Sequence, residues 1–145
     1  MKPRRTRQLV AVYEVVRAAD DHPTAEEVHA RVRRWLPRVS LGTVYRNLQK
    51  LAARERLQLV QLADRPARYD GRVEHHAHFL CEQCGALTDL AAKCAAAPPA
   101  RAALDQAGYA VRTHALTFYG QCPACVAARK TSSPREGNRA SVRGA

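Results

Sequence analysis

The sequence lacks the features that mark several large classes of protein. Its apolar stretches fall short of the roughly 20 residues that a helix needs to cross a membrane, so no membrane span is predicted. The basic start of the chain leads into Leu9–Val16, which contains Tyr13 and Glu14 and no small-residue cleavage site, so it is not typical of a signal peptide. Acidic residues are scarce, with 13 Asp and Glu against 24 Lys and Arg in 145 residues, a net charge of +11. This imbalance favours a partner that carries negative charge.

The excess positive charge is concentrated in two parts of the chain. Residues 1–74 hold 16 Lys and Arg against 9 Asp and Glu, whereas residues 75–126 hold 3 of each and residues 127–145 hold 5 against 1. Each Lys or Arg can displace a condensed counterion from a nucleic acid, so the basic first half is the candidate DNA contact. A basic surface kept only for solubility explains this asymmetry less well. The break near residue 74 predicts two structural units.

Three helices are predicted in the basic half. Apolar residues recur on one face of 7–19, which indicates an amphipathic helix. Thr24 is placed to cap a second helix, which Pro37 ends, and Ser40 caps a third helix over 41–55. Two helices joined by a short turn and preceded by another form a helix-turn-helix.

A β-hairpin is predicted directly after the third helix. Residues 57–62 roughly alternate apolar and polar side chains, Asp64-Arg65-Pro66 forms a turn, and residues 67–70 return. This hairpin would be the wing of a winged helix.

The second half has a different pattern. Residues 77–80 and 86–90 are predicted strands around a turn, a short helix opens at Pro98-Pro99 and closes at Gly108, and residues 109–119 form one long strand. From Ala127 onward the chain is basic and increasingly rich in polar residues, Pro and Gly, so it is predicted to be disordered.

Four of the five cysteines form two Cys-x-x-Cys pairs, Cys81 with Cys84 and Cys122 with Cys125. Two residues between the sulfurs let one tight turn present both thiolates to a single tetrahedral ion, and four thiolates leave no open position. The pattern predicts a structural zinc that joins the end of the last long strand to the start of the first, in a reducing, cytoplasmic compartment. Two independent redox dithiols are the alternative. Cys94 belongs to neither pair and is interpreted as a plain core or surface residue.

Histidines precede the first cysteine pair. On a strand, His76 and His78 point to one face, where two imidazoles favour a metal or a carboxylate. Asp70 and Asp89 could supply oxygen ligands, and a mixed nitrogen and oxygen set suits Fe(II), Mn(II) or Zn(II). Spacing alone also allows each histidine to be a solvated surface residue, and it does not connect His22 with the others.

Five motifs in this order resemble the ferric uptake regulator (Fur) family over residues 4–126, nearly the whole chain. They are His22-Pro-Thr-Ala-Glu-Glu, Ser40-Leu-Gly-Thr-Val-Tyr-Arg-Asn-Leu, Arg68-Tyr-Asp70, His76-Ala-His78-Phe-Leu-Cys81-Glu-Gln-Cys84-Gly and Tyr119-Gly-Gln-Cys122-Pro-Ala-Cys125.

The resemblance implies an α+β homodimer. Residues 1–72 would form a winged-helix DNA-binding domain, residues 73–126 a small α/β dimerisation and metal-binding domain stapled by one structural Zn²⁺ per subunit, and residues 127–145 a disordered basic tail. It also implies one regulatory Fe²⁺ or Mn²⁺ per subunit at the hinge, held by His22, Asp70, His76, His78 and Asp89. An A·T-rich palindromic operator would be contacted by Ser40, Thr43, Tyr45 and Arg46.

The function implied is a metal-dependent DNA-binding repressor. The peroxide-sensing branch of the family uses a site of three His and two Asp, whereas a Glu is usual at the position of Asp89 in the iron-sensing branch. In the peroxide sensors, bound Fe(II) reacts with hydrogen peroxide and oxidises a ligating histidine, and His22 and His76 match the oxidisable positions. Peroxide sensing is therefore favoured, with an iron- or manganese-responsive repressor of metal uptake genes as the alternative.

A further metal site occurs near the first cysteine pair in the iron-sensing branch. This sequence keeps His75 and His114 of that site, but its other two positions are Ala77 and Ala96. The additional site is therefore not expected to form.

Two other classes of protein are alternatives to a repressor. No nucleophile–base pair stands outside the cysteine pairs, and a zinc closed by four thiolates has no catalytic position, which disfavours a zinc hydrolase or thiol oxidoreductase. The chain is therefore predicted not to be an enzyme. A zinc-stapled interaction module without a DNA role is distinguished by whether the protein binds A·T-rich duplex specifically.

Overall fold

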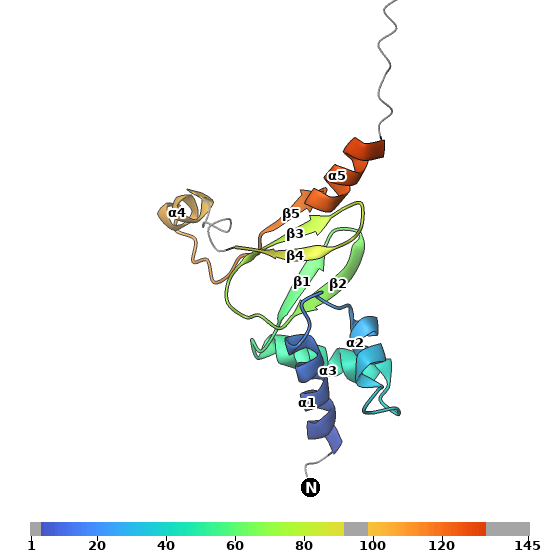
Figure 1. Cartoon of the computed structure of the whole chain (residues 1–145). Coiled ribbons are helices and arrows are strands. Elements are labelled where there is room, and N and C mark those ends of the chain that lie inside the picture. The colour runs from blue at the N-terminus through green and yellow to red at the C-terminus, as the bar shows by residue number, and fades with distance from the viewer. Residues whose placement is uncertain (1–3, 92–98, 133–145) are drawn as a thin grey trace, which may run out of the picture.

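The structure is a computed structural model that describes residues 4–91 and 99–132, and its fold is α+β (Figure 1). Cys94 and Ala96 lie outside the described residues. In chain order the elements are α1 (Arg4–Arg17), α2 (Ala25–Val32), α3 (Leu41–Ala53), β1 (Gln58–Leu62), β2 (Arg65–Asp70), β3 (Ala77–Cys81), β4 (Leu87–Leu90), α4 (Pro99–Gln106), β5 (Thr117–Gly120) and α5 (Pro123–Ser132).

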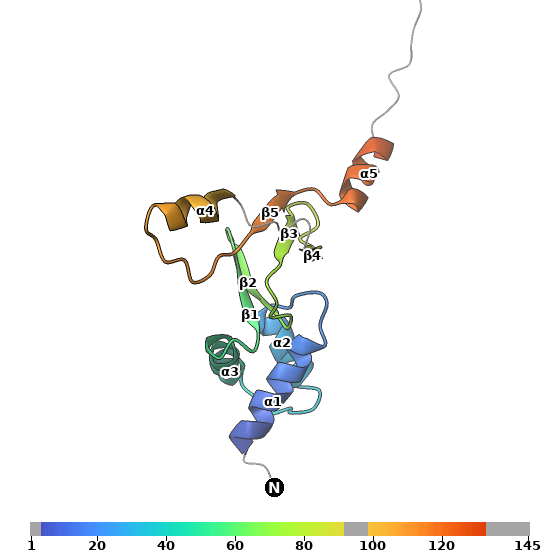
Figure 2. The ribbon, with the colours of Figure 1, turned by 90° about the vertical axis from the view of Figure 1, so that its left-hand side faces the viewer.

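The first three helices pack together at one end of the molecule, and the hairpin β1–β2 lies between them and the sheet of β3, β4 and β5 (Figure 1, Figure 2). Their shared core is aliphatic and includes the fully buried Val12, Val28 and Leu48. Full burial of such a side chain contributes roughly 1.5–3 kcal/mol. Val60 and Leu62 of the hairpin form a second cluster with apolar residues of β3 and β4, so the wing packs against the second half.

The predicted helix caps are confirmed. The Thr24 hydroxyl accepts the backbone N–H of Glu27 at 3.3 Å, while the Glu27 carboxylate accepts that of Thr24 at 2.7 Å. Ser40 accepts the backbone N–H of Thr43 at 3.2 Å. The second helix was predicted to run to Pro37 but ends at Val32, because the chain turns through residues 33–35 before it reaches the proline.

The wing is a two-stranded antiparallel hairpin with Leu59 opposite Tyr69. The predicted turn at residues 64–66 is wrong, because Arg65 already pairs with Leu62. Asp64 takes a left-handed conformation, φ 55°, which tightens the turn. Pro66 is therefore inside β2, where a two-stranded sheet tolerates it as an edge residue.

The second sheet has the strand order β4-β3-β5, with β3 antiparallel to β4 and parallel to β5. The long strand predicted over 109–119 is reduced to Thr117–Gly120. A strand needs a neighbour for its backbone groups, and β3 pairs with β5 only from His78 to Cys81. Residues 109–116 are not part of a strand in the described part of the chain, although the Leu116 carbonyl accepts the His78 backbone N–H at 3.0 Å.

The composition predicts that the chain is disordered from Ala127 onward. This prediction is wrong for the residues directly after Ala127, which are helical. Helix α5 continues to Ser132. Pro123 fits the first helical position, and Arg129 and Lys130 stand in the last turn, where positive charge complements the helix dipole. Residues 133–145 lie outside the described residues. Within 4–91 and 99–132, no helix is both long enough and apolar enough to cross a bilayer.

The two halves meet where Gly71 follows β2. A Cβ atom at this position would lie 2.6 Å from Arg17 Cα and 2.9 Å from the Val16 carbonyl oxygen, so only glycine fits without moving the backbone. The junction is therefore held directly against the end of α1.

Replacing Gly71 by alanine is expected to lower the free energy of unfolding by about 1–3 kcal/mol, the usual cost of overpacking. Gly42→Ala is the matched control, because the atom nearest to its added Cβ is the flexible end of the Arg46 side chain, at 3.7 Å. Urea unfolding of both variants measures the difference. Equal free energies of unfolding for the two variants would show that the backbone around Gly71 can shift at little cost.

Candidate metal centres

Five side chains from both halves converge on one point. His22 lies between α1 and α2, Asp70 ends β2, His76 precedes β3, His78 lies on β3 and Asp89 on β4. One ligand atom from each lies within 4.8 Å of all the others. The pairing of His78 with Asp89 across β3 and β4 explains how the second half contributes both nitrogen and oxygen atoms.

The spacing of these atoms fits a shared ion. Asp89 Oδ1 lies 2.7 Å from His22 Nε2, 3.1 Å from His76 Nε2 and 3.4 Å from His78 Nε2. Asp70 Oδ2 lies 2.9 Å from His76 Nε2 and 3.3 Å from His78 Nε2. Adjacent ligands of an ion bound at about 2.1 Å in six-coordinate geometry are about 3 Å apart. Three imidazoles and two carboxylates are also a donor set suited to Fe(II), Mn(II) or Zn(II).

Most side chains of this cluster are buried, so their charges are stabilised by one another rather than by water. Four of its residues are buried, and Asp89 is 29% exposed. Burial raises the pKa of Asp70, but hydrogen bonds from His22 and His78 outweigh it and hold that pKa well below its ordinary value. Burial lowers the pKa of His22, but Asp70 and Asp89 outweigh it and raise that pKa above the ordinary value. Asp70 thus stays ionised and draws positive charge into the site.

His22 is held in an unusual conformation. Its φ is 50°, a region that costs a non-glycine residue of order 1–3 kcal/mol, and its Nδ1 is buried without a hydrogen-bond partner among the described residues. The loop that carries His22 is fixed to the wing by two hydrogen bonds. Arg68 Nη1 donates to the His22 carbonyl at 3.1 Å, and the Tyr69 backbone N–H donates to the Pro23 carbonyl at 3.0 Å. These contacts direct His22 Nε2 at Asp89.

An opening leads to the cluster from outside. A cavity of about 530 Å³ is lined by residues of both halves, among them Arg17, His22, Asp70 and Asp89. Arg72 also lines it and places Nη1 3.7 Å from Asp89 Oδ2. No pattern in the sequence indicates this arginine, because its contact with Asp89 depends on the folding of the junction.

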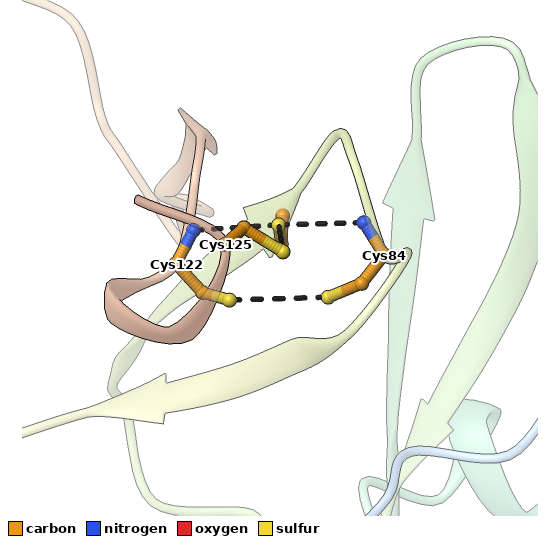
Figure 3. A group of neighbouring side chains, drawn as sticks. Cys84, Cys122 and Cys125 are labelled. Carbon is orange, nitrogen blue, oxygen red and sulfur yellow. Dashed lines mark hydrogen bonds between the residues drawn. The ribbon is translucent and has the colours of Figure 1, made fainter. Parts of the chain in front are cut away.

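The four paired cysteines form the second centre (Figure 3). The short sulfur–sulfur contacts run between the two pairs, 3.8 Å from Cys81 to Cys125 and 3.9 Å from Cys84 to Cys122. A tetrahedral ion with Zn–S bonds of about 2.3 Å separates its sulfurs by about 3.8 Å. The geometry therefore fits one shared zinc better than two independent dithiols.

The backbone prepares the Cys81 sulfur for this role. It accepts the backbone N–H groups of Cys84 at 3.5 Å and Cys122 at 3.3 Å, which lower the pKa of the thiol to about 6. Because β5 is parallel to β3, Cys81 lies opposite Gly120, and the centre joins the adjacent ends of the two strands. The sequence predicted that the zinc joins the end of the last strand to the start of the first. This was wrong, because the four cysteines lie at the ends of both β3 and β5.

Comparison with known proteins shows the family of this chain. The model of the ferric uptake regulator family matches residues 1–119. The chain belongs to this family. The transcriptional regulator FurA of Mycobacterium tuberculosis is 35% identical over 122 residues, covering 83% of this chain and 81% of FurA. The peroxide-responsive repressor PerR of Staphylococcus aureus is 28% identical over 120 residues, covering 83% and 80%.

Solved structures agree with the fold of this Fur-family chain. The crystal structure of the Campylobacter jejuni peroxide stress regulator superposes with a TM-score of 0.72 at 26% identity, covering 83% of this chain and 90% of that one. Relatives therefore include both FurA and peroxide regulators.

His75 and His114 lie beside each other, outside both centres. His75 Nε2 lies 2.7 Å from His114 Nε2, and Ala77 is buried without a donor side chain. No third His, Cys or carboxylate joins the pair within the described residues.

The residues expected to contact DNA lie at the start of α3. Ser40 and Thr43 share a hydroxyl contact of 2.9 Å, and Arg46 Nη2 donates to the Thr43 hydroxyl at 3.1 Å. Tyr45 is 38% exposed, and its hydroxyl donates to Glu26 of α2 at 2.8 Å. Sequence spacing could not reveal this last contact, which joins two different helices.

Proposed function

We propose that this chain is a metal-dependent repressor in which a regulatory ion fixes the angle between the two halves. The domains would span residues 1–72 and 73–126, the latter forming the homodimer. Each subunit would hold one structural Zn²⁺ at the four cysteines and one Fe²⁺ or Mn²⁺ at the His/Asp cluster. The observation that carries this proposal is the contact of His22, from the helical half, with Asp89 of β4 at 2.7 Å.

The contacts around the cluster explain how an ion would act at a distance. His22 is tied to the wing, and the other four donors follow the junction at Gly71 or end the strand before it. An ion that binds all five stabilises one relative orientation of the halves. In a dimer, that orientation sets the distance between the two copies of α3 and so their fit to successive major grooves.

The first experiment asks whether the metal-loaded protein selects a DNA sequence. Zinc-loaded protein with Mn(II) is incubated with a library of random duplexes, and the enriched sequence is called the selected duplex. We expect an A·T-rich palindrome. Failure to enrich any sequence would contradict the proposal and favour an interaction module without a DNA role.

Tyr45→Ala is expected to weaken binding to the selected duplex by roughly 1–3 kcal/mol, because the exposed ring is placed to meet a thymine methyl group. Binding to random duplex should change much less. Tyr45→Phe keeps the ring but removes the hydrogen bond to Glu26, so it separates the two roles. Fluorescence anisotropy measures the affinities of the wild type and of both variants for the selected and the random duplex. Equal losses of Tyr45→Ala on both duplexes would make Tyr45 a backbone contact.

We infer further that the signal is hydrogen peroxide. An Fe(II) ion held by the His/Asp cluster would supply the electrons that cleave the O–O bond of peroxide. In the net reaction one oxygen atom enters a ring C–H of His22 or His76 and the other leaves as water. Five donors leave room on a six-coordinate ion, and the cavity beside Asp89 gives a small molecule access.

With Fe(II) bound, peroxide is expected to add one oxygen to His22 or His76 and to release the selected duplex at the same rate. Peptide mass spectrometry and anisotropy follow the two events. The Mn(II) form is the control and should resist, because Mn(II) does not drive this chemistry efficiently. Equal release from both forms, with oxidation only of the cysteines, would replace peroxide sensing by the iron- or manganese-responsive alternative.

A further inference from the structure

A group of exposed residues in the turn between α2 and α3 has no role in either metal centre. The group consists of Arg33, Arg34, Trp35 and Arg38 and is called the turn patch. All four are exposed, and Trp35 is the only tryptophan of the chain, with 66% of its side chain accessible. A large exposed aromatic ring with three exposed arginines close to it in the sequence is a recognisable binding feature.

The charge of the turn patch is not neutralised by the protein. Within the described residues, the side chains of its three arginines form no ion pair and no hydrogen bond. Some other arginines of this half have acidic partners, as Arg31 has Asp21 and Arg68 has Glu27. Three unpaired guanidinium groups within six positions therefore create a local field that attracts anions.

The position of the turn patch indicates which anion. The turn leads directly into Ser40, the cap of α3, so the patch is continuous with the surface expected to meet DNA. Trp35 and Arg38 also line a concavity of about 370 Å³ together with Arg7 of α1. The turn and the beginning of α1 lie at the end of the molecule that is remote from the sheet of β3, β4 and β5 (Figure 1, Figure 2).

We propose that the turn patch binds the phosphodiester backbone of duplex DNA beside the bases that α3 contacts. This inference rests on the proposed function. Guanidinium groups bind phosphate oxygens through paired hydrogen bonds, and the indole N–H of Trp35 is a further donor to a phosphate. A second copy of the chain is a less suitable occupant, because two such patches would repel each other.

The single tryptophan allows a direct test with the wild-type protein. Quenching of its fluorescence by acrylamide is measured for zinc- and Mn(II)-loaded protein, alone and saturated with the selected duplex, while anisotropy of labelled DNA reports binding. We expect the quenching constant to fall severalfold on binding. Unchanged quenching in protein that is bound to DNA would overturn the inference alone, whereas absence of any duplex binding would overturn the proposed function as well. If the quenching constant fell with increasing protein concentration in the absence of DNA, the occupant would be a second copy of the chain, which would contradict the proposal.

The salt dependence of binding tests the arginines. Arg33→Ala/Arg34→Ala should reduce the slope of log affinity against log salt by about 0.9 for each lost phosphate contact, equally on selected and random duplex. The control is Arg101→Ala/Arg112→Ala, which removes two exposed arginines of the second half and should leave the slope unchanged. Identical slopes for wild type and the turn variant would overturn the inference, and the ratio of selected to random affinity reports independently on α3.

Discussion

Replacing Cys81 by serine is expected to release the zinc, dissociate the dimer and unfold the second half. Cys81 is fully buried at the end of β3, and its sulfur contacts those of the other pair while it accepts two backbone N–H groups. Structural zinc sites contribute on the order of 10 kcal/mol to folding, comparable to the whole stability of a domain. The small second sheet has few buried residues of its own that could compensate.

Zinc content, molecular mass in solution and thermal melting measure the effect. Cys94→Ser is the matched control, since it removes the one cysteine that belongs to neither pair, and it should keep the zinc and the dimer. A Cys81→Ser protein that remains dimeric with the melting temperature of the wild type would show that the four cysteines do not share a structural ion.

Replacing His22 by alanine is expected to abolish the effect of Mn(II) on DNA binding. His22 alone reaches the cluster from the loop between α1 and α2, so without it an ion contacts the first half only through Asp70, at the junction that leads into the second half. Coupling between two sites is typically 1–3 kcal/mol, which corresponds to about 5- to 150-fold in affinity. In the variant, Mn(II) should no longer raise the affinity for DNA, while the zinc, the dimer and the folded core are retained.

Anisotropy with the selected duplex across a Mn(II) titration measures the loss, and zinc analysis with thermal melting checks the fold. His114→Ala is the control, because His114 contacts His75 and lies outside the cluster. It should keep the wild-type stimulation. If His22→Ala responded to Mn(II) as the wild type does, the hinge would be set by something other than this histidine.

Local signals made the helical half predictable from the sequence. Thr24 and Ser40 act through contacts within three residues, so their capping positions can be identified before any tertiary structure is known. The paired cysteines are likewise adjacent in sequence, and β3 and β4 bring His78 opposite Asp89 through a short hairpin. The family resemblance supplied the remaining step for the His/Asp cluster.

The features that sequence reasoning missed depend on contacts between distant segments. His22 reaches the cluster through a left-handed backbone and a loop fixed by Arg68, neither of which periodicity reports. The length of β5 depends on where β3 begins, and Arg72 meets Asp89 only because the junction folds against α1. Composition also misled at α5, where helix-favouring residues continue into a basic, polar segment.

The central claim is that occupancy of the His/Asp cluster controls DNA binding. The most direct test is the affinity of the zinc-loaded wild-type protein for the selected duplex, measured by anisotropy with and without one equivalent of Mn(II) per subunit. We predict an increase of about 5- to 150-fold with Mn(II). The same affinity in both conditions, with Mn(II) shown to be bound, would contradict the account.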